Sequence, residues 1–214
     1  MVFPFSYVKM KIPDYIKQFQ GGENFINGKV FIELLKENPV IAAVKDMEGL
    51  EKSLQSDCQI IFILFGDLVN IAEIVARIKN AGKLAMVHID LIDGLASRDV
   101  AVDFIAKNTC ADGILSTRPN MVHRAKVCGL LAVQRFFLLD SIALSNIGRQ
   151  PSLKDADAIE ILPGLMPKVI KRLVASVGKP VIAGGLITDK EDIVHALNAG
   201  AIAISSTNHD TWFM

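Results

Sequence analysis

Eight short apolar runs, separated by segments of helical periodicity, constrain the fold of this chain more than any other feature. The run at 60–65, IIFILF, is continuously apolar, as expected for a parallel strand covered on both faces. Strands that alternate with helices indicate repeated strand–helix units and not hairpins. We predict the strands at residues 39–44, 60–65, 83–90, 113–117, 130–139, 158–162, 181–183 and 201–204.

This alternation predicts an α/β fold, a compact (β/α)8 barrel of the TIM-barrel type. Such barrels typically need about 200 residues or more, whereas the units here occupy about 185, so we expect short helices and minimal loops. An open, doubly wound sheet is the alternative, because strand counts from sequence are error-prone. We predict a helix that follows a cap at Asp46 and ends near 56, and further helices at 31–37, 68–80, 98–108, 119–128, 142–149 and 166–177.

The first 28 residues differ in character from the rest of the chain. Aromatic residues, prolines and the Gly21-Gly22 pair break any periodicity, which predicts a poorly ordered N-terminal extension over residues 1–28. Residues 29–214 are expected to form a single (β/α)8-like domain.

Charge and composition argue against several classes of protein. Lys and Arg total 23, as do Asp and Glu, so no global positive field attracts nucleic acid. Cys58, Cys110 and Cys128 show no paired spacing, and we expect buried, reduced thiols in a cytoplasmic protein. Charged residues interrupt every apolar run before the ~20 residues of a membrane helix, and no signal-peptide pattern is present. We expect no metal and no cofactor, because metal-ligand spacing, GxGxxG and the P-loop pattern are absent from the sequence.

Two small, donor-rich segments follow the last two predicted strands. Gly184 and Gly185 follow one strand, and Ser205 and Ser206 follow the next. Glycine lets the backbone approach an anion closely and direct several N–H groups at it. Because the loops after strands seven and eight commonly bind phosphate in (β/α)8 barrels, we predict a phosphate site here.

A histidine, a carboxylate and a lysine lie at the ends of two other predicted strands. His88 and Asp90 are two residues apart and would share a face of one strand. They can act as an acid/base pair, hold ligand hydroxyls, or form a purely structural hydrogen-bonded pair. Lys45 follows the first strand and can neutralise a phosphate, form a Schiff base, or simply be solvated.

Further polar residues end the middle strands. Ser116, Thr117 and Arg118 combine two hydroxyls with a guanidinium group suited to an oxyanion. Arg135 interrupts the apolar run LLAVQRFFLLD, so it must be paired or face a polar cavity. Glu160 is the evident partner, and the two residues form either a structural ion pair or part of a ligand site.

Seven segments together give the chain a family resemblance: ENPVIAAVKD, MVHIDLIDGL, GILSTRPN, QRFFLLDS, IEILPG, IAGGLI and ISSTN. In this order and spacing, over residues 30–212, the chain resembles the glycerol uptake operon antiterminator regulatory proteins. The resemblance implies a regulatory barrel domain that binds glycerol 3-phosphate, acts on leader mRNA of glycerol-catabolism genes and prevents early termination. It places ligand contacts on the matched segments, at His88, Asp90, Ser116, Thr117, Arg118, Arg135, Glu160, Gly184, Gly185, Ser205 and Ser206.

An RNA-binding role requires a local basic patch, because the net charge is zero. Two predicted helical segments offer candidate cations, although both sets can equally be ordinary solvated helix faces. A homo-oligomer is also possible. One set comprises Arg118, His123, Arg124 and Lys126, and the other comprises Lys168, Lys171, Arg172 and Lys179.

The alternative hypothesis is an enzyme that acts on a small phosphorylated sugar or polyol, namely an isomerase, aldolase or lyase. His88, Asp90 or Glu160 would then serve as acid or base, and Lys45 as an electrophile. Against it, no residue in the sequence shows a clear pairing of a nucleophile with a base.

Overall fold

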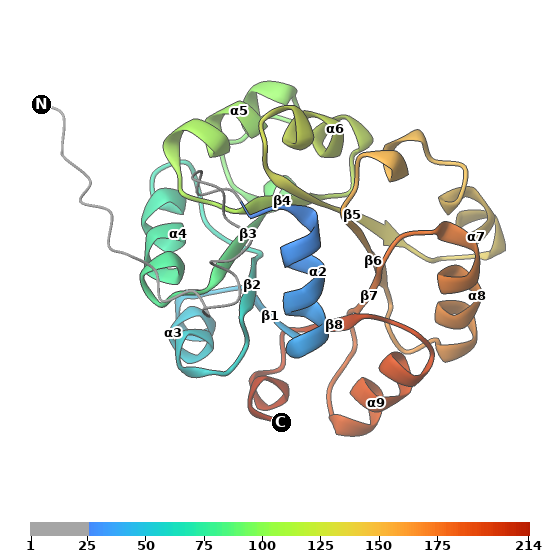
Figure 1. Cartoon of the computed structure of the whole chain (residues 1–214). Coiled ribbons are helices and arrows are strands. Elements are labelled where there is room, and N and C mark those ends of the chain that lie inside the picture. The colour runs from blue at the N-terminus through green and yellow to red at the C-terminus, as the bar shows by residue number, and fades with distance from the viewer. Residues whose placement is uncertain (1–25) are drawn as a thin grey trace, which may run out of the picture.

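Eight parallel strands form a closed barrel in the computed structural model, which describes residues 26–214 (Figure 1). Each strand pairs with its neighbours in sequence, and β1 closes the barrel against β8. The predicted (β/α)8 barrel is therefore confirmed, and the open doubly wound sheet was the wrong alternative. The strands are β1 (Val40–Val44), β2 (Ile60–Ile63), β3 (Leu84–His88), β4 (Gly113–Ser116), β5 (Leu131–Phe137), β6 (Ala158–Leu162), β7 (Val181–Gly184) and β8 (Ala203–Ser206).

Short helices surround this barrel, as expected for a chain of this length. They range from seven residues in α7 to eleven in α8, and the 3-10 turn η3 (His209–Phe213) takes the place of a helix after β8. The surrounding helices are α3 (Met47–Gln55), α4 (Ile71–Asn80), α5 (Asp99–Asn108), α6 (Pro119–Val127), α7 (Ser141–Ile147), α8 (Pro167–Val177) and α9 (Lys190–Asn198), with 3-10 turns η1 (Ile89–Leu91) and η2 (Pro151–Lys154).

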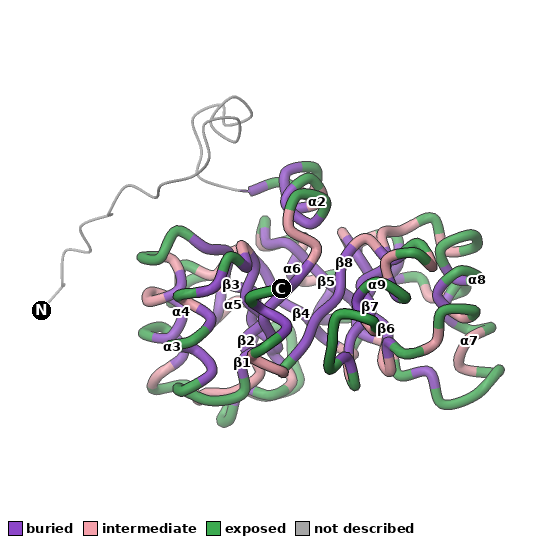
Figure 2. The backbone as a smooth tube through the Cα atoms, turned by 90° about the horizontal axis from the view of Figure 1, so that it is seen from below, coloured by how far each residue is buried: buried purple, intermediate pink, exposed green. Residues whose placement is uncertain are grey.

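Helix α2 (Gly28–Glu37) closes the N-terminal end of the barrel (Figures 1 and 2). The Asn27 side chain caps it by accepting hydrogen bonds from the backbone N–H groups of Lys29 and Val30. Its apolar face, including Phe31 and Leu35, packs against side chains that point into the barrel. The helix predicted at 31–37 is confirmed and begins one turn earlier. Of the predicted N-terminal extension, residues 1–25 lie outside the described part of the chain.

Alternation along each strand divides the core into two parts. Inward side chains such as Ile41, Phe62 and Met86 fill the barrel together with α2. Outward side chains such as Ile61 and Val87 pack beneath the surrounding helices. Both faces of the strands are therefore buried, which explains their continuous apolar sequences.

Two similar polar clamps fix strand starts at the N-terminal end of the barrel. Asp112, just before β4, accepts hydrogen bonds from the Lys79 ammonium at 2.6 and 2.7 Å and from the Ala85 backbone N–H at 2.8 Å. Before β6, the next-but-one strand, Asp157 binds Lys126 and the backbone N–H of Ala132 in the same way. Each clamp joins a helix end to two neighbouring strands. In both cases the aspartate satisfies a strand N–H that the ladder leaves open.

Several predicted boundaries were wrong, and local hydrogen bonds explain the differences. The helix predicted from residue 68 begins at Ile71, because Asp67 accepts backbone hydrogen bonds from Val69 and Asn70 and holds a turn there. Strand β3 ends at His88, where the chain enters η1. Strand β8 includes both Ser205 and Ser206, since both pair with β1 and Ser205 also pairs with β7, so these serines end the strand and do not form a loop.

The expectation that all three cysteines are buried was also wrong. Cys58 is buried, Cys128 is partly buried and Cys110 is exposed. In residues 26–214 we find no helix with the length and apolar character needed to cross a membrane.

Candidate functional site

A buried ion pair lies at the C-terminal mouth of the barrel, between adjacent strands. The Nε atom of Arg135 on β5 donates to Oε2 of Glu160 on β6 at 2.5 Å, and both side chains point inward. The Ser205 hydroxyl on β8 donates to the other carboxylate oxygen of Glu160, also at 2.5 Å. The predicted pairing of Arg135 with Glu160 is therefore confirmed. Ser205 joins them, so the Glu160 carboxylate on β6 binds polar groups from two other strands, β5 and β8.

Gly184 lies directly against this group. A Cβ atom at this position would lie 2.6 Å from the Ser205 hydroxyl and 2.7 Å from Oε1 of Glu160, so a side chain fits only if that hydrogen-bonded pair moves. Gly185 and Leu186 then adopt positive φ angles of 75° and 62°, which turn the chain sharply after β7. Glycine adopts this conformation without strain, whereas leucine rarely does. The predicted phosphate segment thus lies over the Glu160 carboxylate.

Ser206 differs from Ser205 because it points away from the barrel interior. Its hydroxyl donates to the backbone carbonyl of Ile187 at 2.8 Å and accepts from the N–H of Asn208 at 3.0 Å. The side chain therefore ties the loop after β7 to the loop after β8. This places Ser206 as a support for the predicted phosphate segment, with its hydroxyl already engaged.

His88, the last residue of β3, lies near Arg135 at the mouth. It is only 3% exposed, and its Nδ1 atom has no hydrogen-bond partner among the described residues. Burial and, second, the positive charge of Arg135 together lower the pKa of His88 from 6.5 to about 4, against the opposing effect of Asp90. The imidazole is consequently neutral at pH 7, with an unfilled hydrogen-bonding position on Nδ1.

Asp90, two residues after His88, is the centre of a second polar group. Its carboxylate accepts hydrogen bonds from the Ser116 hydroxyl at 2.9 Å, from the Thr117 backbone N–H at 2.7 Å and from the Thr117 hydroxyl at 3.0 Å. The prediction that His88 and Asp90 share a strand face was wrong, because the strand ends between them. Their side chains nevertheless approach to 4.0 Å.

Lys45 and Arg118 occupy more exposed positions around the mouth. Lys45 follows β1 and is exposed. Arg118 lies 3.5 Å from Asp90 and also donates to the Ser97 hydroxyl. Neither cation belongs to the buried group around Glu160.

The two candidate RNA-binding sets differ in their ion pairing. On α6, Arg124 is paired with Asp103 at 2.6 Å and Lys126 with Asp157 at 2.8 Å. The α8 residues Lys168, Lys171 and Arg172 are exposed.

Three residues that support the site were not among the sequence candidates. The Gly164 N–H donates to the Gly185 carbonyl at 3.1 Å, Ser97 contacts Arg118, and Gln134 donates to the Thr117 carbonyl at 3.1 Å. Gly164 sits in the segment LPGL after β6, where a glycine beside a proline signals a turn. Ser97 has no comparable sequence signal, because its contact depends on how the loop after β3 folds back.

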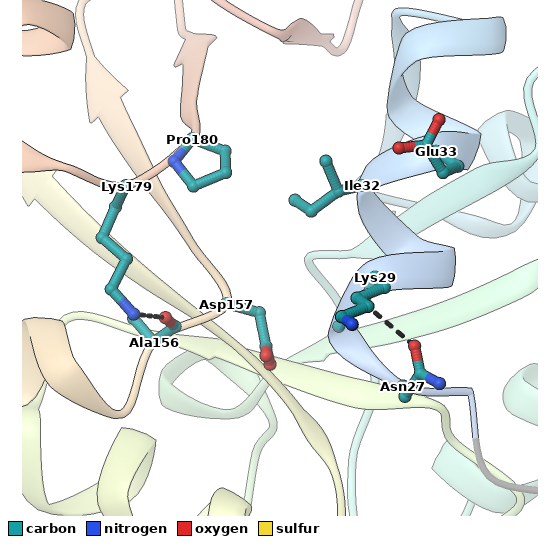
Figure 3. A pocket seen from close by; sticks show the side chains of 9 residues that line it. Asn27, Lys29, Ile32, Glu33, Ala156, Asp157, Lys179 and Pro180 are labelled. Carbon is teal, nitrogen blue, oxygen red and sulfur yellow. Dashed lines mark hydrogen bonds between the residues drawn. The ribbon is translucent and has the colours of Figure 1, made fainter.

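A cavity of about 760 Å³ lies at the opposite end of the barrel (Figure 3). It separates α2 from the starts of β6 and β7, and its polar lining includes Lys29, Glu33, Asp157 and Lys179. Lys179 already donates to the backbone carbonyl of Ala156, and Asp157 already accepts from the Lys126 ammonium. Because (β/α)8 proteins carry their ligand sites at the C-terminal end, we assign the candidate site to the mouth and not to this cavity.

Comparison with known proteins agrees with the sequence resemblance. Residues 40–212 match the family described as "Glycerol-3-phosphate responsive antiterminator". The uncharacterized protein YgcP of Escherichia coli K12 is 45% identical over 181 residues, which is 85% of this chain and 95% of YgcP.

Two solved structures share both fold and sequence with this chain at 33% identity. The glycerol uptake operon antiterminator regulatory protein from Listeria monocytogenes matches with a TM-score of 0.75, and the match covers 82% of this chain and 95% of the Listeria chain. The glycerol uptake operon antiterminator-related protein from Thermotoga maritima matches with a TM-score of 0.72, and the match covers 82% of this chain and 98% of the Thermotoga chain. Enzymes such as the deoxyribose phosphate aldolase of Aeropyrum pernix, at 18% identity and a TM-score of 0.62, share the fold alone. By sequence and fold together, this chain belongs to the glycerol-3-phosphate responsive antiterminator family.

Proposed function

We propose that this protein binds glycerol 3-phosphate at the barrel mouth and, in response, binds leader mRNA of glycerol-catabolism genes and prevents premature termination. Family membership supports the regulatory role. The observation that carries the ligand assignment is the buried Arg135–Glu160–Ser205 group beneath the Gly184-Gly185 turn. It combines a guanidinium, a carboxylate and a close backbone approach at one point.

The chemistry of this group suits a small phosphorylated polyol. The turn after β7 and the guanidinium of Arg135 favour an anion. Glu160 and the free Nδ1 position of neutral His88 can bind hydroxyl groups. A ligand with one phosphate and two hydroxyls, such as glycerol 3-phosphate, uses both kinds of partner.

Calorimetry tests the ligand assignment. We expect wild-type protein to bind glycerol 3-phosphate and to bind glycerol and inorganic phosphate much more weakly. The double variant Arg135→Met/Glu160→Met should stay folded, because apolar replacement of a buried ion pair is often neutral in stability. It should lose ~10-fold or more in affinity, the usual effect of removing hydrogen bonds to charged groups. Arg124→Met/Asp103→Asn removes a comparable ion pair from the outer surface and should bind as wild type. If Arg135→Met/Glu160→Met binds glycerol 3-phosphate as tightly as the control variant does, the ligand does not bind at this site.

A gel-shift with leader RNA tests the regulatory response. Because linkage is reciprocal, glycerol 3-phosphate should tighten RNA binding, and RNA should tighten ligand binding by the same factor. Equal RNA affinity with and without ligand would reject this mechanism.

The enzyme hypothesis is favoured only by the neutral histidine beside a carboxylate, an arrangement that can transfer protons. Lys45 is exposed, whereas lysines that form Schiff bases are usually desolvated. Turnover of sugar phosphates that is lost in His88→Gln would favour the enzyme. Borohydride trapping of Lys45 would support the Schiff-base version.

A further inference from the structure

The cations of α6 are neutralised by neighbouring acids. Arg124 donates two hydrogen bonds to Asp103, at 2.9 and 2.6 Å. His123 Nδ1 lies 2.9 Å from the Asp155 carboxylate, and the Lys126 ammonium lies 2.8 Å from the Asp157 carboxylate. An RNA phosphate approaching this helix would meet the partner carboxylates as well as the cations. The α6 surface is therefore poorly suited to a polyanion.

Helix α8 presents a different surface. Lys168, Lys171 and Arg172 are spaced by three and four residues, so they lie on one side of the helix. The buried residues Ile170 and Leu173 lie on the opposite side, against the barrel. The sequence of α8, PKVIKRLVASV, contains no acidic residue. The three cations therefore form a solvent-facing stripe, which we call the α8 basic stripe.

Neighbouring acids do not neutralise the α8 basic stripe. Helix α9 packs beside α8 (Figure 1) and carries Glu191 and Asp192 in its first turn. Asp192 accepts hydrogen bonds from the backbone and side chain of Thr188, and Glu191 lies 3.9 Å from His195 on its own helix. Among residues 26–214, no carboxylate lies within ion-pair distance of the three stripe cations.

The loop that leads into α8 packs on the candidate ligand segment. Besides its hydrogen bond to the Gly185 carbonyl, Gly164 approaches the end of β7 closely: a Cβ atom on it would lie 3.1 Å from the backbone N of Gly184 and 3.2 Å from the backbone carbonyl carbon of Ala183. Only two residues separate Gly164 from the first residue of α8. A change at the Gly184-Gly185 turn on ligand binding can thus move the start of α8 directly.

We propose that the α8 basic stripe is the surface that binds the phosphate backbone of leader RNA, and that its position is linked to the ligand site through Gly164. This inference rests on the proposed function. Three phosphate contacts with single-stranded RNA contribute a slope of about −2 to a plot of log affinity against log salt concentration. At 0.1 M salt this corresponds to roughly a 100-fold contribution to affinity.

The test measures leader RNA binding by fluorescence anisotropy, with glycerol 3-phosphate present, over a range of KCl concentrations. Lys168→Gln/Lys171→Gln/Arg172→Gln should bind roughly 100-fold more weakly at 0.1 M salt, with a salt slope shallower by about 2. The control, Lys36→Gln/Lys52→Gln/Lys107→Gln, removes the same net charge from α2, α3 and α5 and should match wild type. Calorimetry should show unchanged glycerol 3-phosphate affinity in the stripe variant, which establishes that it is folded.

The outcomes separate this inference from the proposed function. If wild-type protein fails to bind leader RNA, the proposed function is wrong. If wild type binds but the stripe variant keeps the same affinity and salt slope, RNA binds elsewhere and the inference alone is wrong. If both triple variants weaken equally, net charge and not the α8 basic stripe determines binding, which also overturns the inference.

Discussion

Replacing His88 with glutamine should change how the stability of this protein depends on pH. The pKa of His88 falls from an ordinary value of 6.5 to about 4 in the folded protein, first because the side chain is buried and second because Arg135 is nearby. Between these two values the unfolded chain binds a proton that the folded protein excludes. The free energy of unfolding therefore decreases as the pH falls from 6.5 to 4.

The shift sets the size of this effect. One pKa unit corresponds to about 1.4 kcal/mol of unfolding free energy, so the difference between 6.5 and about 4 corresponds to about 3 kcal/mol. The stabilising contribution is fully present above pH 6.5 and is lost by about pH 4. His88→Gln has no titrating group at this position and should lack this part of the pH dependence.

Urea unfolding followed by circular dichroism measures the difference. Without ligand, the wild type should lose about 3 kcal/mol more than His88→Gln between pH 6.5 and pH 4. His195→Gln, which removes an exposed imidazole on α9, controls for the loss of one histidine. If wild type and His88→Gln lose stability in parallel, folding does not lower the pKa of His88 and our account of the mouth is wrong.

Three further substitutions test the site and the fold. Gly184→Ala should cost about 1–3 kcal/mol by overpacking, and it should weaken glycerol 3-phosphate binding in calorimetry, whereas Gly148→Ala, with open space around it, should do neither. Asp112→Asn should lower the free energy of urea unfolding by about 3 kcal/mol because it breaks a largely buried ion pair with Lys79; Lys52→Gln at an exposed pair should change it by less than about 1 kcal/mol, and equal losses would contradict this reading. Phe31→Ala should cost about 3–5 kcal/mol, since the ring is fully buried at the barrel end, and a near-neutral result would show that α2 is dispensable.

The fold was predictable because its signal is repeated along the chain. Buried parallel strands read as apolar runs, and the surrounding helices add their own periodicity. The strand ends were harder to predict, because pairing with neighbours decides them. Ser205 and Ser206 look like loop residues in sequence, yet β8 extends through them since β1 and β7 offer hydrogen-bond partners.

The candidate site was predictable only where chemistry left few choices. An arginine inside an apolar run needs a carboxylate, which identified the contact between Arg135 and Glu160. Lys126 looked like a surface cation that could bind RNA. Its contact with Asp157, a carboxylate 31 residues further along the chain, joins the end of α6 to the start of β6.

The two base clamps also reveal a hidden repeat within the barrel. Each clamp lysine begins a segment in which lysine, glycine, leucine and alanine recur at the same spacing, and the third residue after each alanine is a polar group of the mouth, His88 in one unit and Arg135 in the other. The aligned residues are Lys79, Gly82, Leu84 and Ala85 in the first unit, and Lys126, Gly129, Leu131 and Ala132 in the second.

Because of this repeat, the clamp at the start of each strand fixes the position, along the strand, of the polar residue near its other end, His88 on β3 and Arg135 on β5. A substitution at position 88 or 135 changes the chemistry of the mouth while the strand beneath keeps its place. Loss of Asp112 or Asp157 instead frees the start of a strand and shifts the polar group carried at its far end. Ligand preference can therefore diverge within this architecture at single positions of the mouth, provided that the clamps below are kept.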